Sequence, residues 1–217
     1  MTICRNAAAA LTVLAVITLA PRRSVPLIAQ ASQADERPVI LAVGESTTAG
    51  YGVSRELSYP SQLQKALDER GYRYRVVNHG VSGSTTGAAL TRLSRGMGLL
   101  PKIVIIALGG NDAGSRVPLD TTRANLAKLI SMFKRAGAVV FVADRALGGS
   151  SLVAETAKEH HAVLMPPLLT GVSGNPELLL GDGSHPNAEG YAIIVRNLLA
   201  IIEPHLIKAT ASTARSN

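Results

Sequence analysis

The sequence predicts an α/β fold: a three-layer α/β/α sandwich around a five-stranded parallel sheet. Five short, almost uniformly apolar segments alternate with segments of helical periodicity along most of the 217 residues. Strands that helices cover on both faces lose the alternation of polar and apolar side chains, so uniformly apolar strands favour a parallel sheet. Hydrophobic residues make up 47% of the chain, which is enough to fill the core of one such domain.

The first two predicted strands and helices lie in the first half of the chain. Val39–Val43 is wholly apolar, as expected of a buried strand. Leu57–Arg70 is a predicted helix, because apolar residues recur on one face and a glycine follows its end. Tyr74–Val77 has the composition of a strand. Thr86–Leu100 has helical spacing, although two glycines weaken its end.

The second half of the chain contains the clearest strand. Lys102–Leu108 is rich in β-branched residues and uncharged after its first residue. Thr121–Ala136 carries apolar residues at helical spacing and is followed by a glycine, and the apolar run Ala138–Ala143 is a further strand. The pattern closes with a short helix, a short strand and a final helix that stops before a proline, over Leu152–His160, Ala162–Met165 and Ala188–Ile202.

Residues 1–31 are typical of a secretory signal peptide. They combine a basic start, an uncharged apolar stretch from Ala7 to Ala20 and a small-x-small site at Ala29–Ala31. The stretch is shorter than the roughly 20 residues of a spanning helix, although an uncleaved anchor remains the alternative. We therefore expect a signal peptide over 1–31, a linker over 32–37, one folded domain over 38–207 and a disordered tail over 208–217, in a periplasmic or secreted protein.

The charge and cysteine content change once this segment is set apart. The net charge is +7, and three arginines but no acidic residue lie within residues 1–31, so their removal leaves +4. Without tryptophan and with two phenylalanines and five tyrosines, the chain lacks material for a base-stacking surface. The single cysteine, Cys4, leaves with the same segment, which excludes disulfides and thiolate metal sites. We expect a monomer with no nucleic-acid partner and no stable membrane insertion after cleavage.

Four polar segments lie where a parallel sheet places its functional residues, beyond the carboxyl ends of the strands. Three of them follow predicted strands and the fourth precedes the last helix; they are Gly44–Gly50 (GESTTAG), Asn78–Thr85 (NHGVSGST), Gly109–Asp112 (GGND) and Asp182–Pro186 (DGSHP). Such a sheet brings segments of this kind to a single edge. We therefore expect one site built from all four.

Ser46, Asp182 and His185 have the chemistry of nucleophilic catalysis. Ser46 sits where a strand turns into a helix, so its hydroxyl can be exposed; the alternative is that Ser46 caps the helix. Asp182 precedes His185 by three residues, with a glycine between them that permits a turn, and could hold its imidazole in one tautomer. The rival pair His160–His161 lies at a predicted helix end, which favours a structural role.

Together and in this order, the four segments resemble the sequence blocks of the SGNH hydrolases, also called GDSL-type esterases, over Val39–Ile202. The Ala-Gly-Tyr-Gly after the serine and the Gly-Gly-Asn-Asp are most similar to the small periplasmic thioesterase/lysophospholipase and arylesterase branch. The resemblance implies a flavodoxin-like sheet and a triad of Ser46, Asp182 and His185. It implies an oxyanion hole formed by the N–H groups of Ser46 and Gly83 and the Asn111 side chain, with no cofactor and no metal. Turn chemistry is the alternative for Gly83 and Asn111.

Two departures from the family pattern bear on activity. The first block reads Gly-Glu-Ser where the family has Gly-Asp-Ser, and the extra methylene of Glu45 could shift the serine loop by about an ångström. Asp144–Ser151 is short and glycine-rich, and no aromatic residue lies between Phe141 and Tyr191. The substrate-binding residues therefore cannot be carried over from the family.

We expect a serine ester hydrolase that acts on small-molecule esters through an acyl-enzyme, with thioester hydrolysis as a further activity. Two alternatives remain at this point. One is a carbohydrate O-acetylesterase on the same fold, which a short acyl pocket would suit. The other is a binding module that has lost catalysis because of Glu45.

Overall fold

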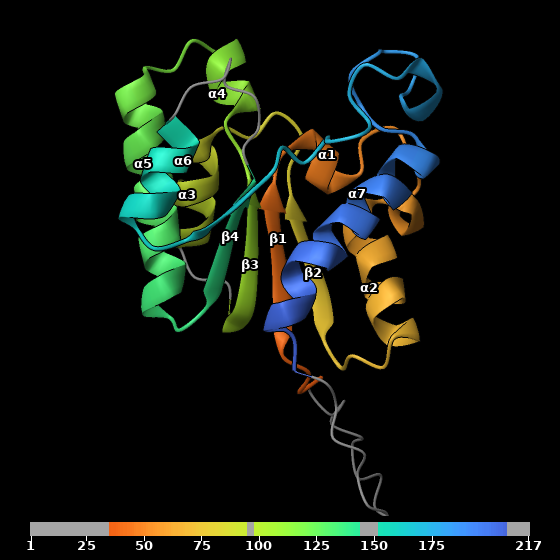
Figure 1. The fold of residues 1–217 in the computed structure, drawn as a ribbon. Helices are drawn as coiled ribbons and strands as arrows, with labels where there is room; N and C mark the ends of the chain where they lie inside the picture. The colour runs from red at the N-terminus through yellow and green to blue at the C-terminus, as the bar shows by residue number, and fades with distance from the viewer. Residues whose placement is uncertain (1–34, 95–97, 144–151, 208–217) are drawn as a thin grey trace, which may run out of the picture. The chain divides into compact units, whose positions relative to one another are not determined.

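The computed structural model describes residues 35–94, 98–143 and 152–207. Its five strands form one sheet in the order β2-β1-β3-β4-β5, and every neighbouring pair is parallel (Figure 1). The strands are β1 (Val39–Gly44), β2 (Arg75–Gly80), β3 (Pro101–Ala107), β4 (Val139–Ala143) and β5 (Val163–Met165). The predicted five-stranded parallel sheet is confirmed. The predicted signal peptide, the tail and the segment Asp144–Ser151 lie outside the described residues.

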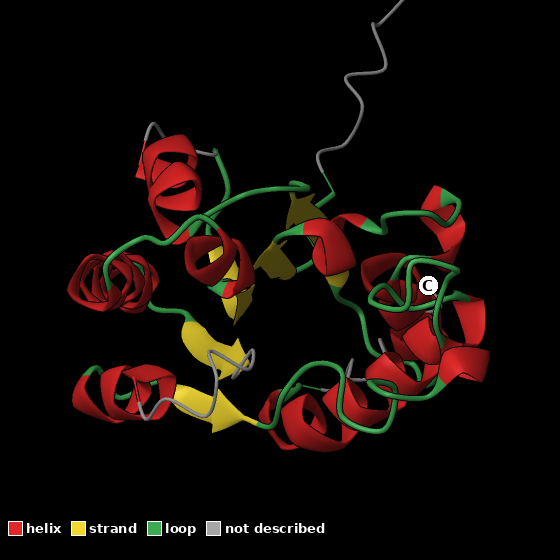
Figure 2. Ribbon diagram, turned by 90° about the horizontal axis from the view of Figure 1, so that it is seen from above, coloured by secondary structure: helices red, strands yellow, loops and turns green. Residues whose placement is uncertain are grey.

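Helices cover both faces of the sheet, as Figures 1 and 2 show. The helices are α1 (Ser46–Ala49), α2 (Tyr59–Glu69), α3 (Thr86–Ser94), α4 (Gly110–Gly114), α5 (Leu119–Arg135), α6 (Leu152–Glu159) and α7 (Ala188–Ile202). Three short 3₁₀ helices are η1 (Arg55–Leu57), η2 (Pro176–Leu178) and η3 (Glu203–His205). Helices α2 and α7 pack into one core cluster, and α3, α5 and α6 into the other. The fold is thus the predicted three-layer sandwich.

The uniformly apolar strands have a direct structural cause. Ile40 and Ala42 of β1 belong to the cluster under α2 and α7, whereas Leu41 and Val43 belong to the cluster on the opposite face. Because successive strand residues point to opposite faces, a strand covered on both sides needs apolar residues at every position.

The main differences from the prediction concern four elements. Strand β2 continues through Asn78 and His79 to Gly80, because these residues pair with β1. It is an edge strand, half-buried along its length, so it tolerates polar residues that the apolar pattern excluded. Helix α3 ends at Ser94, and Gly98–Leu100, predicted as helical, are not. Helices α1 and α4 are too short to produce a periodic signal.

The strand order determines where a site can form. The chain runs from β1 to β2 on one side and then crosses to β3 on the other, so β1 and β3 flank the point where the order reverses. Loops separate at such a point and leave a crevice beyond the strand ends. Helix α1 begins just after β1 and α4 just after β3, which brings two of the polar segments to this crevice. None of the helices in the described ranges combines the length and apolar character that a membrane span requires.

Candidate active site

Ser46 is the first residue of α1, immediately after β1. Glycines let this short helix pack tightly on the sheet: a Cβ on Gly44 would collide with the Thr48 side chain, and one on Gly80 with the backbone of Ala49. The helix cap is Glu45 rather than Ser46. The Ser46 side chain is therefore not used as the cap that the alternative prediction proposed.

The structure brings Ser46, His185 and Asp182 into one hydrogen-bonded row. His185 Nε2 lies 2.8 Å from Ser46 Oγ, across 139 residues of sequence, and His185 Nδ1 lies 2.7 Å from Asp182 Oδ2. An ionised carboxylate only accepts hydrogen bonds, so Nδ1 carries the proton of a neutral imidazole. The Nε2 lone pair then accepts the hydroxyl proton of Ser46, which is the arrangement that activates a serine.

A tight turn fixes Asp182 beside His185. Gly183 has a φ of 67°, in the left-handed region that glycine adopts without strain. The backbone N–H groups of His185 and Ser184 donate to Asp182 Oδ1 at 3.0 and 2.9 Å. These two bonds, followed by that of the His185 imidazole, hold the pKa of Asp182 well below its usual range. Asp182 therefore stays a carboxylate at every pH at which the His185 imidazole is neutral.

The backbone on either side of His185 is anchored to the preceding segment. The His185 carbonyl accepts from the N–H of Leu180 at 2.7 Å, and the N–H of Asn187 donates to the Leu178 carbonyl at 3.0 Å. The Asn187 side chain then caps α7 by accepting from the backbone N–H groups of Glu189 and Gly190. The imidazole is thus held between an anchored loop and a capped helix.

The other two predicted oxyanion residues lie at the same edge of the sheet. Gly83, with a φ of 76°, sits in a turn that the N–H of Ser84 closes onto the Val81 carbonyl at 3.0 Å. Within the described part of the chain, the backbone N–H groups of Ser46 and Gly83 have no hydrogen-bond acceptor. Asn111, in α4, donates from its side-chain nitrogen to the Ser84 carbonyl at 3.2 Å. Gly83 is thus a turn residue whose N–H is left for another acceptor.

The Glu45 carboxylate reaches the segment that follows β3. The predicted effect of its extra methylene on the serine loop stays a prediction. Its Oε2 accepts from the backbone N–H of Asn111 at 3.1 Å and from the Asn111 side-chain nitrogen at 2.5 Å. Only 2% of Glu45 is exposed. This contact joins the segment after β1 to the segment after β3.

The neighbouring acid, Asp112, is also buried and fixes the loops. It accepts from the backbone N–H of Thr86 at 2.8 Å, from the Thr86 hydroxyl at 2.5 Å and from the Thr122 hydroxyl at 3.3 Å. The Asn125 side chain donates to the same threonine hydroxyl at 3.2 Å. These bonds tie α4 to the starts of α3 and α5, and leave Asp112 out of reach of a catalytic role.

Sequence reasoning missed one residue at the site, Tyr51. Its ring packs against that of His185, with centroids 4.5 Å apart and ring planes tilted by 41°, and half of the residue is exposed. The Ala-Gly-Tyr-Gly segment was the signal available for it.

The rival His160 contacts the Ser131 hydroxyl at 3.1 Å instead. His79 is half-buried beside Arg92, and burial, followed by that guanidinium, lowers its pKa.

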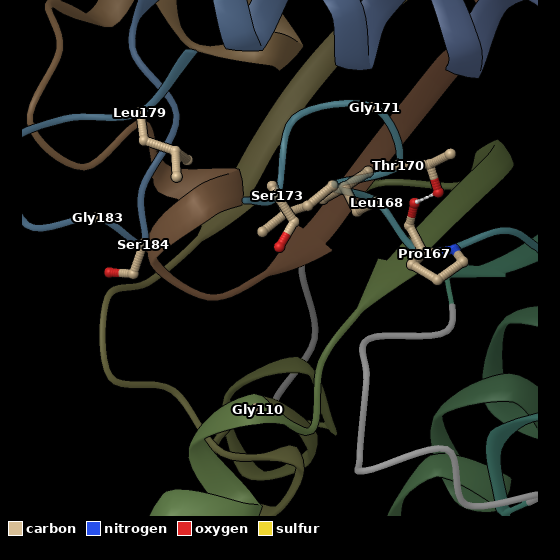
Figure 3. A pocket seen from close by; sticks show the side chains of 10 residues that line it. Gly110, Pro167, Leu168, Thr170, Gly171, Ser173, Leu179, Gly183 and Ser184 are labelled. Atoms are coloured by element: carbon tan, nitrogen blue, oxygen red, sulfur yellow. Dashed lines mark hydrogen bonds between the residues drawn. The ribbon is translucent and has the colours of Figure 1, made fainter. Parts of the chain in front are cut away.

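A pocket of about 550 Å³ opens beside the segments that carry Asn111 and His185 (Figure 3). Figure 3 shows Gly110 of α4 facing the loop that follows β5, with Ser184 at the side of the opening. Among the described residues, the lining has no charged side chain and consists of Gly110, Pro167, Leu168, Leu169, Thr170, Gly171, Ser173, Leu179, Gly183 and Ser184. Gly110 and Ser184 are direct neighbours of Asn111 and His185. The pocket can therefore hold an uncharged group attached to a carbonyl at Ser46.

Comparisons with known proteins agree with this chemistry. The model of the GDSL-like lipase/acylhydrolase family matches residues 42–193. An arylesterase of Vibrio mimicus is 33% identical over 82% of this chain and 94% of its own, and esterase TesA of Pseudomonas aeruginosa is 30% identical over 77% and 89%. The structure of the esterase EstA from Pseudoalteromonas sp., inhibited by monoethylphosphonate, superposes with a TM-score of 0.71 at 25% identity, over 77% of this chain and 97% of that one.

Proposed function

The chain belongs to the GDSL-like lipase/acylhydrolase family, and from that premise we propose that it hydrolyses small, uncharged carboxylic esters through an acyl-serine intermediate. The observation that carries the proposal is the row Ser46–His185–Asp182, with distances of 2.8 and 2.7 Å. The esterase names of the relatives support the same reaction class.

The first half of the reaction transfers the acyl group to Ser46. Ser46 Oγ attacks the ester carbonyl carbon as His185 Nε2 takes its proton, and the carbonyl electron pair moves to the oxygen. Collapse of this tetrahedral species breaks the bond to the alcohol oxygen, which receives the proton from His185. In the second half, water gives its proton to His185 and attacks the acyl-serine, and Ser46 leaves with that proton.

The developing oxyanion needs hydrogen-bond donors. The N–H groups of Ser46 and Gly83, which have no acceptor among the described residues, and the Asn111 side chain support this assignment, because they lie in the segments that follow β1, β2 and β3 at one edge of the sheet. Loss of one such donor typically lowers kcat by about 10²–10³. The same complete set of groups argues against a binding module that has lost catalysis.

The pocket supports an acyl group larger than acetyl. Its leucine and proline lining suits an alkyl or aryl substituent, and the absence of charged side chains among the described lining residues disfavours an anionic one. We rank a general carboxylesterase or arylesterase above a carbohydrate O-acetylesterase for this reason. Thioesters are a second substrate class for the same nucleophile. We propose that residues 1–31 export the enzyme and that it works as a monomer.

Hydrolysis of p-nitrophenyl butyrate by the purified domain tests the proposal. We expect Ser46→Ala to lower kcat by about 10⁴–10⁶ while leaving the thermal unfolding midpoint within a few degrees of wild type. The matched control is Ser94→Ala, an exposed serine at the end of α3, which should leave both quantities unchanged. Turnover by Ser46→Ala at the wild-type rate would refute the assignment.

A further inference from the structure

Glu45 is a buried charged group that the proposed reaction does not use directly. We propose that Glu45 is a positioning residue for the oxyanion step: it holds the Asn111 amide so that one N–H is available to the oxyanion, and the length of its side chain is what matters. This inference rests on the proposed esterase function.

Glu45 holds Asn111 by two hydrogen bonds. A single oxygen, Glu45 Oε2, accepts from both the backbone and the side-chain nitrogen of Asn111, at 3.1 and 2.5 Å. Tying both nitrogens to one atom fixes rotation about the Asn111 side-chain bonds. Because Glu45 is 2% exposed whereas Asn111 is only partly buried, Glu45 holds Asn111 from the interior of the protein.

The amide has two N–H groups, and both have partners in the described structure. One donates to Glu45 at 2.5 Å, and the other donates to the Ser84 carbonyl at 3.2 Å. A short bond to a carboxylate is charge-assisted and about twice as strong as a neutral bond. When an oxyanion forms, the longer bond to Ser84 is the one that yields. The Glu45 bond stays and aims the released N–H.

The position of Glu45 connects the three donors. Glu45 directly precedes Ser46, whose backbone N–H is the first donor, and it holds Asn111, which supplies the third. The Ser84 carbonyl, on the other side of the Asn111 amide, belongs to the turn that carries Gly83. Glu45 thus links segments from β1, β2 and β3 at the point where the strand order reverses.

The length of the Glu45 side chain determines whether its carboxylate reaches Asn111. Aspartate is shorter by one carbon–carbon bond, about 1.5 Å, which would take the 2.5 Å contact to roughly 4 Å, beyond hydrogen-bond range. Glutamine keeps the length and an acceptor oxygen but loses the charge. The aspartate that the family has at this position should therefore be the worse replacement here, although it keeps the charge.

The test measures kcat and KM for p-nitrophenyl butyrate in wild type, Glu45→Gln, Glu45→Asp and Asn111→Ala. We expect E45Q to retain kcat within tenfold, and E45D and N111A to lose about 10²–10³ with KM changed less than threefold. In the double variant E45D/N111A, the losses should not multiply, because both substitutions remove the same interaction. Should E45D fail to fold, E45Q in the N111A background takes its place, with an expected change in kcat below twofold.

Three outcomes overturn the inference: E45D at least as fast as E45Q, multiplying losses in the double variant, or a twofold or larger effect of E45Q in the N111A background. Thermal unfolding midpoints, measured alongside, identify a variant that has lost only stability. If the wild type turns over the ester and any of these outcomes occurs, this inference alone fails. If the wild type neither turns over the ester nor reacts with a fluorophosphonate at Ser46, the proposed function fails and this inference with it.

Discussion

Replacing Asp182 by asparagine changes one oxygen to an NH₂ group and isolates the role of the carboxylate. The asparagine oxygen can still accept from the N–H groups of Ser184 and His185, which hold the turn at 2.9 and 3.0 Å. The new NH₂ group then faces His185 Nδ1, now 2.7 Å from Asp182 Oδ2. Two donors cannot pair, so His185 must carry its proton on Nε2, where it cannot accept the proton of Ser46.

The expected loss of kcat in Asp182→Asn is large, but the partial exposure of this side chain limits it. In serine proteases, the same change to the wrong tautomer lowers kcat by about 10⁴. The Asp182 side chain is 38% exposed, so the imidazole retains some freedom to reorient. We therefore expect kcat for p-nitrophenyl butyrate to fall by roughly 10²–10⁴. The control Asp120→Asn, at an exposed position in α5, should leave kcat unchanged.

The pH profile gives an independent readout of the same carboxylate. Since its hydrogen bonds lower the pKa of Asp182, the carboxylate stays ionised as the pH falls through the ordinary aspartate value of about 4. Because the pKa of Asp182 is lower in the folded than in the unfolded protein, its ionised form stabilises the fold. This contribution to the stability is fully present above the unfolded-state pKa and is lost only as the pH falls through the folded-state pKa. Above pH 4, log(kcat/KM) of the wild type should fall on the acid side with a slope of one. A slope of two, or a D182N variant within threefold of wild type, would refute the reasoning.

Two further predictions concern the pocket and the packing under the serine. Ser173→Trp should fill the pocket and lower kcat/KM for p-nitrophenyl laurate at least tenfold relative to p-nitrophenyl acetate; Ser173→Ala is its control, and an unchanged ratio would remove the pocket from the acyl site. Gly80→Ala should destabilise the domain by about 1–3 kcal/mol in urea unfolding, because a Cβ there collides with the backbone of Ala49, and an unchanged midpoint would contradict this. Its control is Gly114→Ala, where a Cβ meets nothing within 4 Å.

The sequence predicts those features that leave a local trace. Strands β1, β3 and β4 are apolar at nearly every position because helices cover both faces, and Ser46, Asp182 and His185 lie in recognisable turns at strand or helix ends. The end of β2 was misplaced because an edge strand permits polar residues such as Asn78.

Contacts between distant segments leave no such trace. The bond from Glu45 to Asn111 depends on β1 and β3 being neighbours in the sheet and on the reach of one particular side chain. The ring contact between Tyr51 and His185 depends on how α1 ends relative to the loop before α7. The pocket is likewise formed by the loop after β5 and by Gly110, which are far apart in sequence.

The central claim is that Ser46 is a nucleophile activated by His185. The most direct measurement is intact-mass and peptide analysis after reaction with a fluorophosphonate, which forms a stable bond to an activated serine oxygen. The account predicts a single adduct on Ser46 in the wild type, with fluoride released, and a much slower reaction in His185→Ala. An adduct on another residue, or an unreactive Ser46 in a folded and soluble wild-type domain, would contradict it.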